Sequence, residues 1–215
     1  MSAMAVVLRP VLLCCAALLA AACMRVVGGT PVPAFGGGSA AAASGVDVDE
    51  ILLDKSRMRA MTGAGDDLTI IPSMDGKHPV DLDTLAQTAP AECRFIYSET
   101  LTFGPDIAEF HKTTFQDPPD SGLISEGAAA YRDTGTARRA FDALMTTVED
   151  CATSSAGLLF VGEWSADDES LRIRPGACGR DYRVKSVVLM EVTFCGFPES
   201  VSDIVMTNIV ANVPR

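Results

Sequence analysis

The chain has 215 residues, 48% of them hydrophobic, which is enough for one domain with a sizeable core plus additional segments. Acidic residues outnumber basic ones by 28 to 17, giving a formal net charge of −11 at pH 7. This charge, together with the lack of a basic patch in the sequence, argues against a nucleic-acid partner.

The chain starts with an apolar segment that ends at a cysteine. Val11 to Ala22 form an uninterrupted apolar run of 12 residues. This is short for a membrane span, which needs about 20 residues, and typical of a signal peptide. Arg9 supplies the preceding positive charge, and the residues before Cys23 are small alanines, as a cleavage site requires. We therefore expect residues 1–22 to be a signal peptide, which would remove Cys14 and Cys15.

Cys23 follows this cleavage site directly, an arrangement that resembles the lipobox of bacterial lipoproteins. The resemblance implies that its sulfur receives a diacylglyceryl group and that acylation anchors the protein to the extracytoplasmic face of the cell membrane. The sequence departs from the lipobox in one respect, because Ala20 stands where leucine is usual and the leucine is Leu19. The alternative is an ordinary secreted protein cleaved near Ala22.

A low-complexity stretch separates Cys23 from the rest of the chain. Residues 24–46 are mostly Gly, Ala, Ser, Pro and Val with almost no charge, a composition typical of a flexible linker. We expect residues 23–46 to be the lipidated cysteine and a tether, and residues 47–215 to be the folded domain.

The first half of the domain is predicted to contain short elements. Residues 47–61 indicate one helix that is capped by Asp47 or Asp49 and ended by Gly63 or Gly65. A short extended piece follows at residues 67–73 and is expected to be stopped by Pro72. Residues 79–93 indicate a second short helix with Pro90 after its end, and residues 125–133 indicate a strand.

The strongest helical pattern is residues 134–151. Ala137, Phe141, Leu144, Val148 and Cys151 recur at helical spacing, so Cys151 is expected to point into the core. Residues 157–164 and 169–175 are then predicted to be two strands joined by a turn. A last helix is predicted from Pro198 onward, with an apolar stripe that includes Ile204 and is bordered by Asn208 and Asn212.

Residues 178–195 read as a β-hairpin. A two-residue turn at Ser186-Val187 pairs Lys185 with Val188, and this register places Cys178 opposite Cys195, near disulfide distance. Four cysteines allow three connectivities, and this register favours Cys178–Cys195 together with Cys93–Cys151. Ser-Val is poor chemistry for such a turn, so a longer loop is the alternative. The element order predicts an α+β fold with a mostly antiparallel sheet flanked by helices.

The stretch from Tyr131 to Cys151, followed by Cys178, Cys195 and a closing helix, resembles the PknH-like extracellular sensor domain of a mycobacterial kinase and of mycobacterial lipoproteins. The opening "ILLDKSRMRAMTG" resembles the first helix of that domain. The resemblance covers about residues 48–213. It implies the same two disulfides and a V-shaped cleft that accepts a ligand. One departure is Val148, where the family often has tryptophan.

Motifs for catalysis or cofactors are not found in the sequence. It has no nucleophile elbow, P-loop or dinucleotide fingerprint, so we expect a non-enzymatic protein without cofactors. The only histidines, His78 and His111, match no zinc spacing and are interpreted as exposed loop residues, so no metal site is expected. Trp164, Asn208 and Asn212 are interpreted as edges of the core.

These observations lead to an exported cell-envelope lipoprotein whose domain binds a small-molecule or other envelope ligand in a sensor-type role. The alternative is a structural or protein-docking envelope lipoprotein without a small-molecule ligand. The sequence alone assigns no ligand-binding residue.

Overall fold

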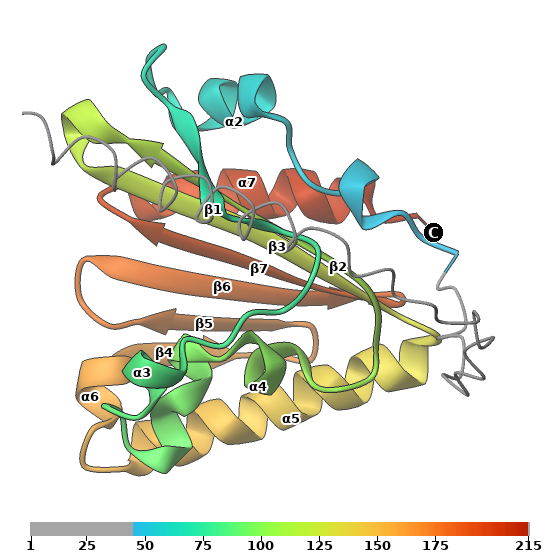
Figure 1. The fold of residues 1–215 in the computed structure, drawn as a ribbon. Helices are drawn as coiled ribbons and strands as arrows, with labels where there is room; N and C mark the ends of the chain where they lie inside the picture. Colours follow the sequence, from blue (N-terminus) through green and yellow to red (C-terminus); the bar gives the residue numbers. More distant parts are fainter. Residues whose placement is uncertain (1–44, 215) are drawn as a thin grey trace, which may run out of the picture. The chain divides into compact units, whose positions relative to one another are not determined.

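The computed structural model describes residues 45–214. The predicted signal peptide, Cys23 and nearly all of the predicted linker lie outside the described residues. The strands form one sheet in the order β1-β2-β3-β7-β6-β5-β4, and every neighbouring pair is antiparallel (Figure 1). The strands are β1 (Thr69–Gly76), β2 (Ile107–Asp117), β3 (Gly122–Tyr131), β4 (Glu163–Ala166), β5 (Ser170–Arg174), β6 (Cys178–Lys185) and β7 (Val188–Cys195).

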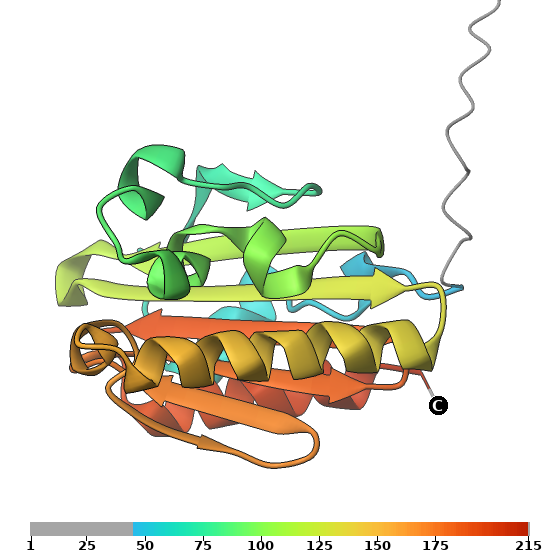
Figure 2. The same cartoon turned by 90° about the horizontal axis from the view of Figure 1, so that it is seen from below.

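Helices cover both faces of this sheet, as expected for an α+β domain of this class. In Figure 2, α5 crosses the sheet in front and α7 lies behind it. The helices are η2 (Val48–Glu50), α2 (Lys55–Thr62), α3 (Asp83–Ala86), η3 (Ala91–Tyr97), α4 (Glu99–Phe103), η4 (Pro118–Asp120), α5 (Thr134–Thr153), α6 (Gly157–Phe160) and α7 (Glu199–Asn212). None of the helices within residues 45–214 is long and apolar enough to cross a bilayer.

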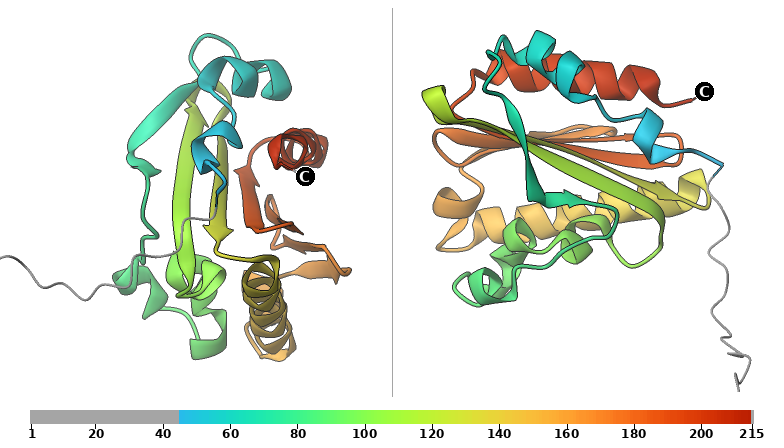
Figure 3. Two further views of the ribbon diagram at one scale, coloured as in Figure 1. Left: turned by 90° about the vertical axis from the view of Figure 1, so that its right-hand side faces the viewer. Right: turned by 45° about the horizontal axis from the view of Figure 1, so that its top comes forward.

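Side chains alternate between the two faces along each strand, which divides the core in two. The α7 face buries Phe115, Ile124, Met190 and Phe194 of the sheet against α7, α2 and the η2 segment. Figure 3 shows α2 lying beside α7 in the right-hand view. The α5 face buries a second cluster that includes Tyr131, Phe141, Leu144, Tyr182 and Leu189.

The helix predicted at 134–151 is confirmed as α5. Asp133 caps it by accepting a hydrogen bond from the Thr136 amide (2.7 Å), and all five residues predicted to face the core are buried. Val148 is fully buried in the α5-face core, so the departure from the family pattern falls in the core.

The predicted hairpin is confirmed in register. Lys185 pairs with Val188 and Cys178 pairs with Cys195, across a turn in which Ser186 takes a left-handed conformation (φ 54°). A two-residue loop therefore forms despite its unfavourable sequence. Both disulfides are present, Cys178–Cys195 and Cys93–Cys151.

Three predicted elements are wrong in detail. The helix predicted at 47–61 is two helices, η2 and α2, because Asp54 caps a new helix by accepting a hydrogen bond from the Arg57 amide.

The extended piece predicted to stop at Pro72 is longer. Strand β1 continues through Pro72, which an edge strand tolerates because one side needs no ladder hydrogen bonds. Its register with β2 shifts between Ile70 and Asp75.

The strand predicted at 157–164 is mostly the short helix α6, and β4 begins only at Glu163. Two glycines explain the path of the chain. A Cβ on Gly157 would lie 2.2 Å from the Ala152 carbonyl oxygen, and one on Gly162 (φ 64°) would lie 2.1 Å from that of Arg174. The chain therefore turns sharply at the start of α6 and again just after it, at two positions where only glycine fits.

Candidate functional site

A cleft opens on the α5 face of the sheet, next to the part of that face that α5 and its apolar partners cover. It encloses about 380 Å³, within the range of small-molecule sites. Its base, which we call the cleft floor, consists of alternate side chains from four adjacent strands: Lys112 and Thr114 of β2, Ser125 of β3, Glu191 and Thr193 of β7, and Arg180 of β6.

The strand registers explain why these polar side chains lie together. Lys112 pairs with Gly127, which pairs with Glu191. In the next row, Thr114 pairs with Ser125, and Thr193 pairs with both Ser125 and Arg180. Because Gly127 has no side chain, Lys112 reaches across it to Glu191, with Nζ 3.2 Å from Oε1.

Glu191 is the most buried charge of the cleft floor, with 1% of its side chain exposed. Its Oε1 accepts hydrogen bonds from Lys112 and from the Thr193 hydroxyl, and Arg180 Nη1 lies 4.0 Å away. Burial raises the pKa of Glu191, but the nearby cations and the hydroxyl outweigh it and hold the pKa below its ordinary value. The cleft floor therefore presents fixed, ionised groups of both signs.

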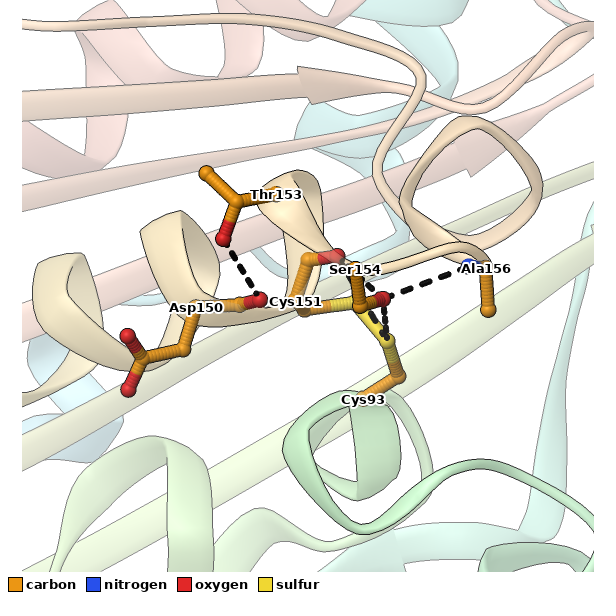
Figure 4. The surroundings of a disulfide bond; sticks show 6 residues. All are labelled: Cys93, Asp150, Cys151, Thr153, Ser154 and Ala156. Carbon is orange, nitrogen blue, oxygen red and sulfur yellow. Dashed lines mark hydrogen bonds between the residues drawn. A yellow bond between two sulfur atoms is a disulfide. The ribbon is translucent and has the colours of Figure 1, made fainter.

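One wall of the cleft is η3 with the start of α4, lined by Phe95, Ile96, Tyr97, Ser98 and Glu99. Two links hold this wall in place. Arg180 Nη2 donates to the Ile96 carbonyl (2.8 Å), and the Cys93–Cys151 disulfide joins η3 to the end of α5. Figure 4 shows this disulfide beside Ser154, whose hydroxyl donates to the Cys151 carbonyl (2.7 Å).

The opposite wall is the end of β1 and the segment 77–82, which we call the strap. Met74, Val80 and Leu82 line the cleft from this side, with 45%, 55% and 49% of each residue exposed. Hydrogen bonds fasten the strap to the η3 wall: the Leu82 amide donates to the Tyr97 carbonyl (2.8 Å), and Asp81 accepts from Ser98 and Thr100. The hydrogen bonds to Asp81 lower its pKa despite the opposing effect of burial.

A more open hollow of about 660 Å³ borders the cleft and shares His78 and Phe110 with it. His78 lines both spaces and is exposed, as expected. His111 differs from its interpretation as a loop residue, because it lies on β2 with 18% of its side chain exposed. Its two ring nitrogens lie 2.8 Å from Asp49 Oδ1 and 2.9 Å from Asp75 Oδ1, so it joins η2 and β1 to β2.

The other singled-out residues lie away from the cleft. Asn212 donates to the Ile51 carbonyl (2.9 Å) and Asn208 contacts Met61, so both join α7 to the N-terminal segment. Trp164 is 41% exposed on the edge strand β4, and Ile204 is also exposed rather than part of the α7 stripe. Among residues 45–214, no group of three or more His, Cys, Asp or Glu side chains is placed to hold a metal ion.

The fold and cleft define a disulfide-linked α+β domain with a walled polar site on one sheet face. A family model described as the PknH-like extracellular domain matches residues 43–211. The chain belongs to this family, a non-catalytic, sensor-type family of extracellular domains.

A solved structure, the extracellular domain of PknH from Mycobacterium tuberculosis, shares this fold with a TM-score of 0.55. The two chains are 14% identical, and the match covers 78% of this chain and 96% of the other. No curated protein matches the chain.

Proposed function

We propose that this protein is an exported, lipid-anchored member of its family that binds a small envelope ligand in the cleft. The observation that carries the proposal is the cleft floor. Six polar or charged side chains from four strands converge there. By contrast, the row of the same sheet face that α5 covers, Phe110–Ala129–Leu189–Val184, is apolar core. A purely structural face would be filled by apolar side chains, since buried charges cost free energy unless they are paired.

Anchoring is the second part of the proposal and depends on Cys23. A diacylated cysteine gives stable attachment because each buried methylene contributes about 0.8 kcal/mol. The low-complexity residues 24–46 would then hold the domain away from the membrane surface, with the cleft open to the envelope.

The location of the ligand can be tested by filling the cleft. Leu123 lies beside the cleft floor and is only partly buried, so Leu123→Trp would occupy the space without replacing a charged residue. Protein isolated from its own host is denatured and the released small molecules are analysed by chromatography and mass spectrometry. We expect a molecule in stoichiometric amount from the wild type and much less from Leu123→Trp. The control, Leu158→Trp at an 85% exposed position outside the cleft, should retain it. Equal amounts from both variants would exclude the cleft as the site.

A protein-docking role is the second candidate, favoured by one observation. Leu158 and Leu159 of α6 are 85% and 73% exposed, and Trp164 follows on the edge strand β4. Exposed apolar patches of this kind are frequent at protein interfaces. Replacing both leucines with serine would abolish co-purification of a partner under this alternative and leave ligand content unchanged.

A further inference from the structure

The cleft contains a side chain that connects the cleft floor with the strap. Glu99, the first residue of α4, has Oε1 3.1 Å from Lys112 Nζ, and its Oε2 accepts a hydrogen bond from the Val80 amide (2.7 Å). Lys112 in turn contacts Glu191. A continuous chain of polar contacts therefore runs from the buried cleft floor through Glu99 to the backbone of the strap.

The two carboxylates that share Lys112 differ in how firmly they are held. Glu191 lies in the middle of the sheet, is 1% exposed and also accepts a hydrogen bond from Thr193. Glu99 lies on the wall and 20% of its side chain is exposed. Of the two, Glu99 can move away from Lys112 into solvent without leaving a buried charge unpaired.

The charges of the cleft favour an anion in place of Glu99. Lys112 and Arg180 balance Glu99 and Glu191, whereas Asp75, which also lines the cleft, has its own partners in His111 and Thr113. If Glu99 moves away, the cleft floor retains two cations and one anion. An incoming group with a single negative charge would restore the balance at Lys112, within reach of Arg180.

The mouth of the cleft has a different chemistry from its floor. Met74, Val80 and Leu82 are large apolar side chains that remain about half exposed there, and the aromatic rings of Phe95 and Phe110 lie deeper in the lining. An apolar group lying between these side chains would be removed from water together with them, which is favourable in proportion to the area covered.

On the basis of the proposed function, we propose that the cleft binds a monoanionic amphiphile whose head group displaces Glu99 from Lys112 and whose apolar body lies against Met74, Val80 and Leu82. Displacement of Glu99 removes the hydrogen bond to the Val80 amide. The strap then loses one of its attachments to the η3 wall. Ligand binding would therefore loosen the strap, a segment at the surface of the domain.

Three small probes separate the parts of this proposal: octanoate has both the charge and the chain, octanol has only the chain, and acetate has only the charge. Binding to the full chain is measured by titration calorimetry in one nonionic detergent, and hydrogen exchange of the Val80 amide is followed in parallel. We expect octanoate to bind at least about tenfold more tightly than the other two. It alone should accelerate exchange at Val80.

Substitutions supply the second comparison. Glu99→Gln removes the competing charge and should tighten octanoate binding about two- to fivefold. Lys112→Gln should weaken it about tenfold or more. Glu163→Gln, at an exposed position on β4 outside the cleft, should leave binding unchanged. Glu99→Gln keeps the test decisive if Lys112→Gln does not fold, because it alters a partly exposed side chain.

Three results would overturn the proposal. Equal binding of octanol and octanoate would show an apolar cleft without an anion site and would leave the proposed function standing. Octanoate binding that is the same in Glu99→Gln and Glu163→Gln would show that Glu99 does not occupy the anion position. Failure of all probes to bind would refute the amphiphile. The proposed function fails instead if the protein from its host carries no small molecule, or if Leu123→Trp retains as much of it as Leu158→Trp.

Discussion

Arg180 of β6 reaches from the cleft floor to the η3 wall, where it donates a hydrogen bond to the backbone carbonyl of Ile96, with Nη2 2.8 Å from the oxygen. The same guanidinium lies 4.0 Å from Glu191. One side chain therefore fixes the distance between the cleft floor and a wall, and the cleft has a defined width before any ligand arrives.

Removal of this connection should destabilise the domain. We expect Arg180→Met to lower the free energy of unfolding by about 1–3 kcal/mol, because a charged hydrogen bond is lost and Glu191 loses a nearby cation. Urea denaturation measures the change. Arg183→Met is the matched control, since Arg183 lies on the same strand but on the other face of the sheet. Equal losses in both variants would contradict the role given to Arg180.

The two disulfides should contribute unequally to stability. Cys93–Cys151 closes a loop with a sequence separation of 58, and Cys178–Cys195 one of 17. The chain-entropy model then gives losses of about 4 and 3 kcal/mol when each pair is replaced by serine. Chemical denaturation of the two double variants compares them. Loss of the first pair should also reduce the amount of retained ligand, because it frees the η3 wall. A larger destabilisation from the hairpin pair would argue against this order.

Glu126 of β3 should make stability depend on pH. Its Oε1 accepts a hydrogen bond from the Leu53 amide (2.7 Å), but Oε2 is buried without a hydrogen-bond partner among residues 45–214, and burial raises the pKa to about 8. The unfolded chain releases this proton near pH 4.5. Between these values the folded state binds more protons, so the contribution of Glu126 to stability falls as pH rises from about 4.5 to 8.

The variant Glu126→Gln isolates this contribution, because glutamine has a similar shape and does not ionise. The two proteins should have similar unfolding free energies near pH 4.5, and the variant should be the more stable one at pH 8. The difference should reach the order of a few kcal/mol. Urea titrations at several pH values provide the measurement. A pH-independent difference between the two proteins would show that Glu126 does not titrate in this range.

Membrane attachment should depend on Cys23. Cys23→Ala removes the sulfur that would carry the diacylglyceryl group, so we expect the protein to move from the membrane fraction to the soluble envelope or medium. Fractionation followed by immunoblotting measures this, with Cys14→Ala as a control that keeps the acceptor. If the Cys23 variant stays with the membrane, the anchor is not a lipid on this residue.

The sequence was sufficient to predict those parts of the fold that depend on local patterns. The α5 stripe and the 178–195 hairpin have strong periodicity, and the register of the hairpin led directly to a disulfide. The strand β2 was missed because its residues are buried or half-buried on both faces, Gln116 excepted, so that its sequence lacks clear alternation. The helix break at Asp54 was missed because the apolar residues on either side continue a helical spacing.

The candidate site was beyond prediction for a different reason. Lys112, Ser125, Arg180 and Glu191 come from four strands, and only the pairing of β2, β3, β7 and β6 brings them together. A partial signal did exist, because the predicted hairpin register already placed Arg180 opposite Thr193 on the face that carries the cysteines. The resemblance to a family with a cleft was the stronger indication.

The central claim is that the cleft holds a small molecule in the cell envelope. Native mass spectrometry of the intact protein from its own host, compared with the denatured mass, tests it most directly. We expect a denatured mass that includes a diacylated Cys23, and a native mass that is larger by one small molecule per chain. Identical native and denatured masses, with the protein otherwise folded and both disulfides formed, would contradict a ligand-binding role and favour docking through the exposed leucines of α6.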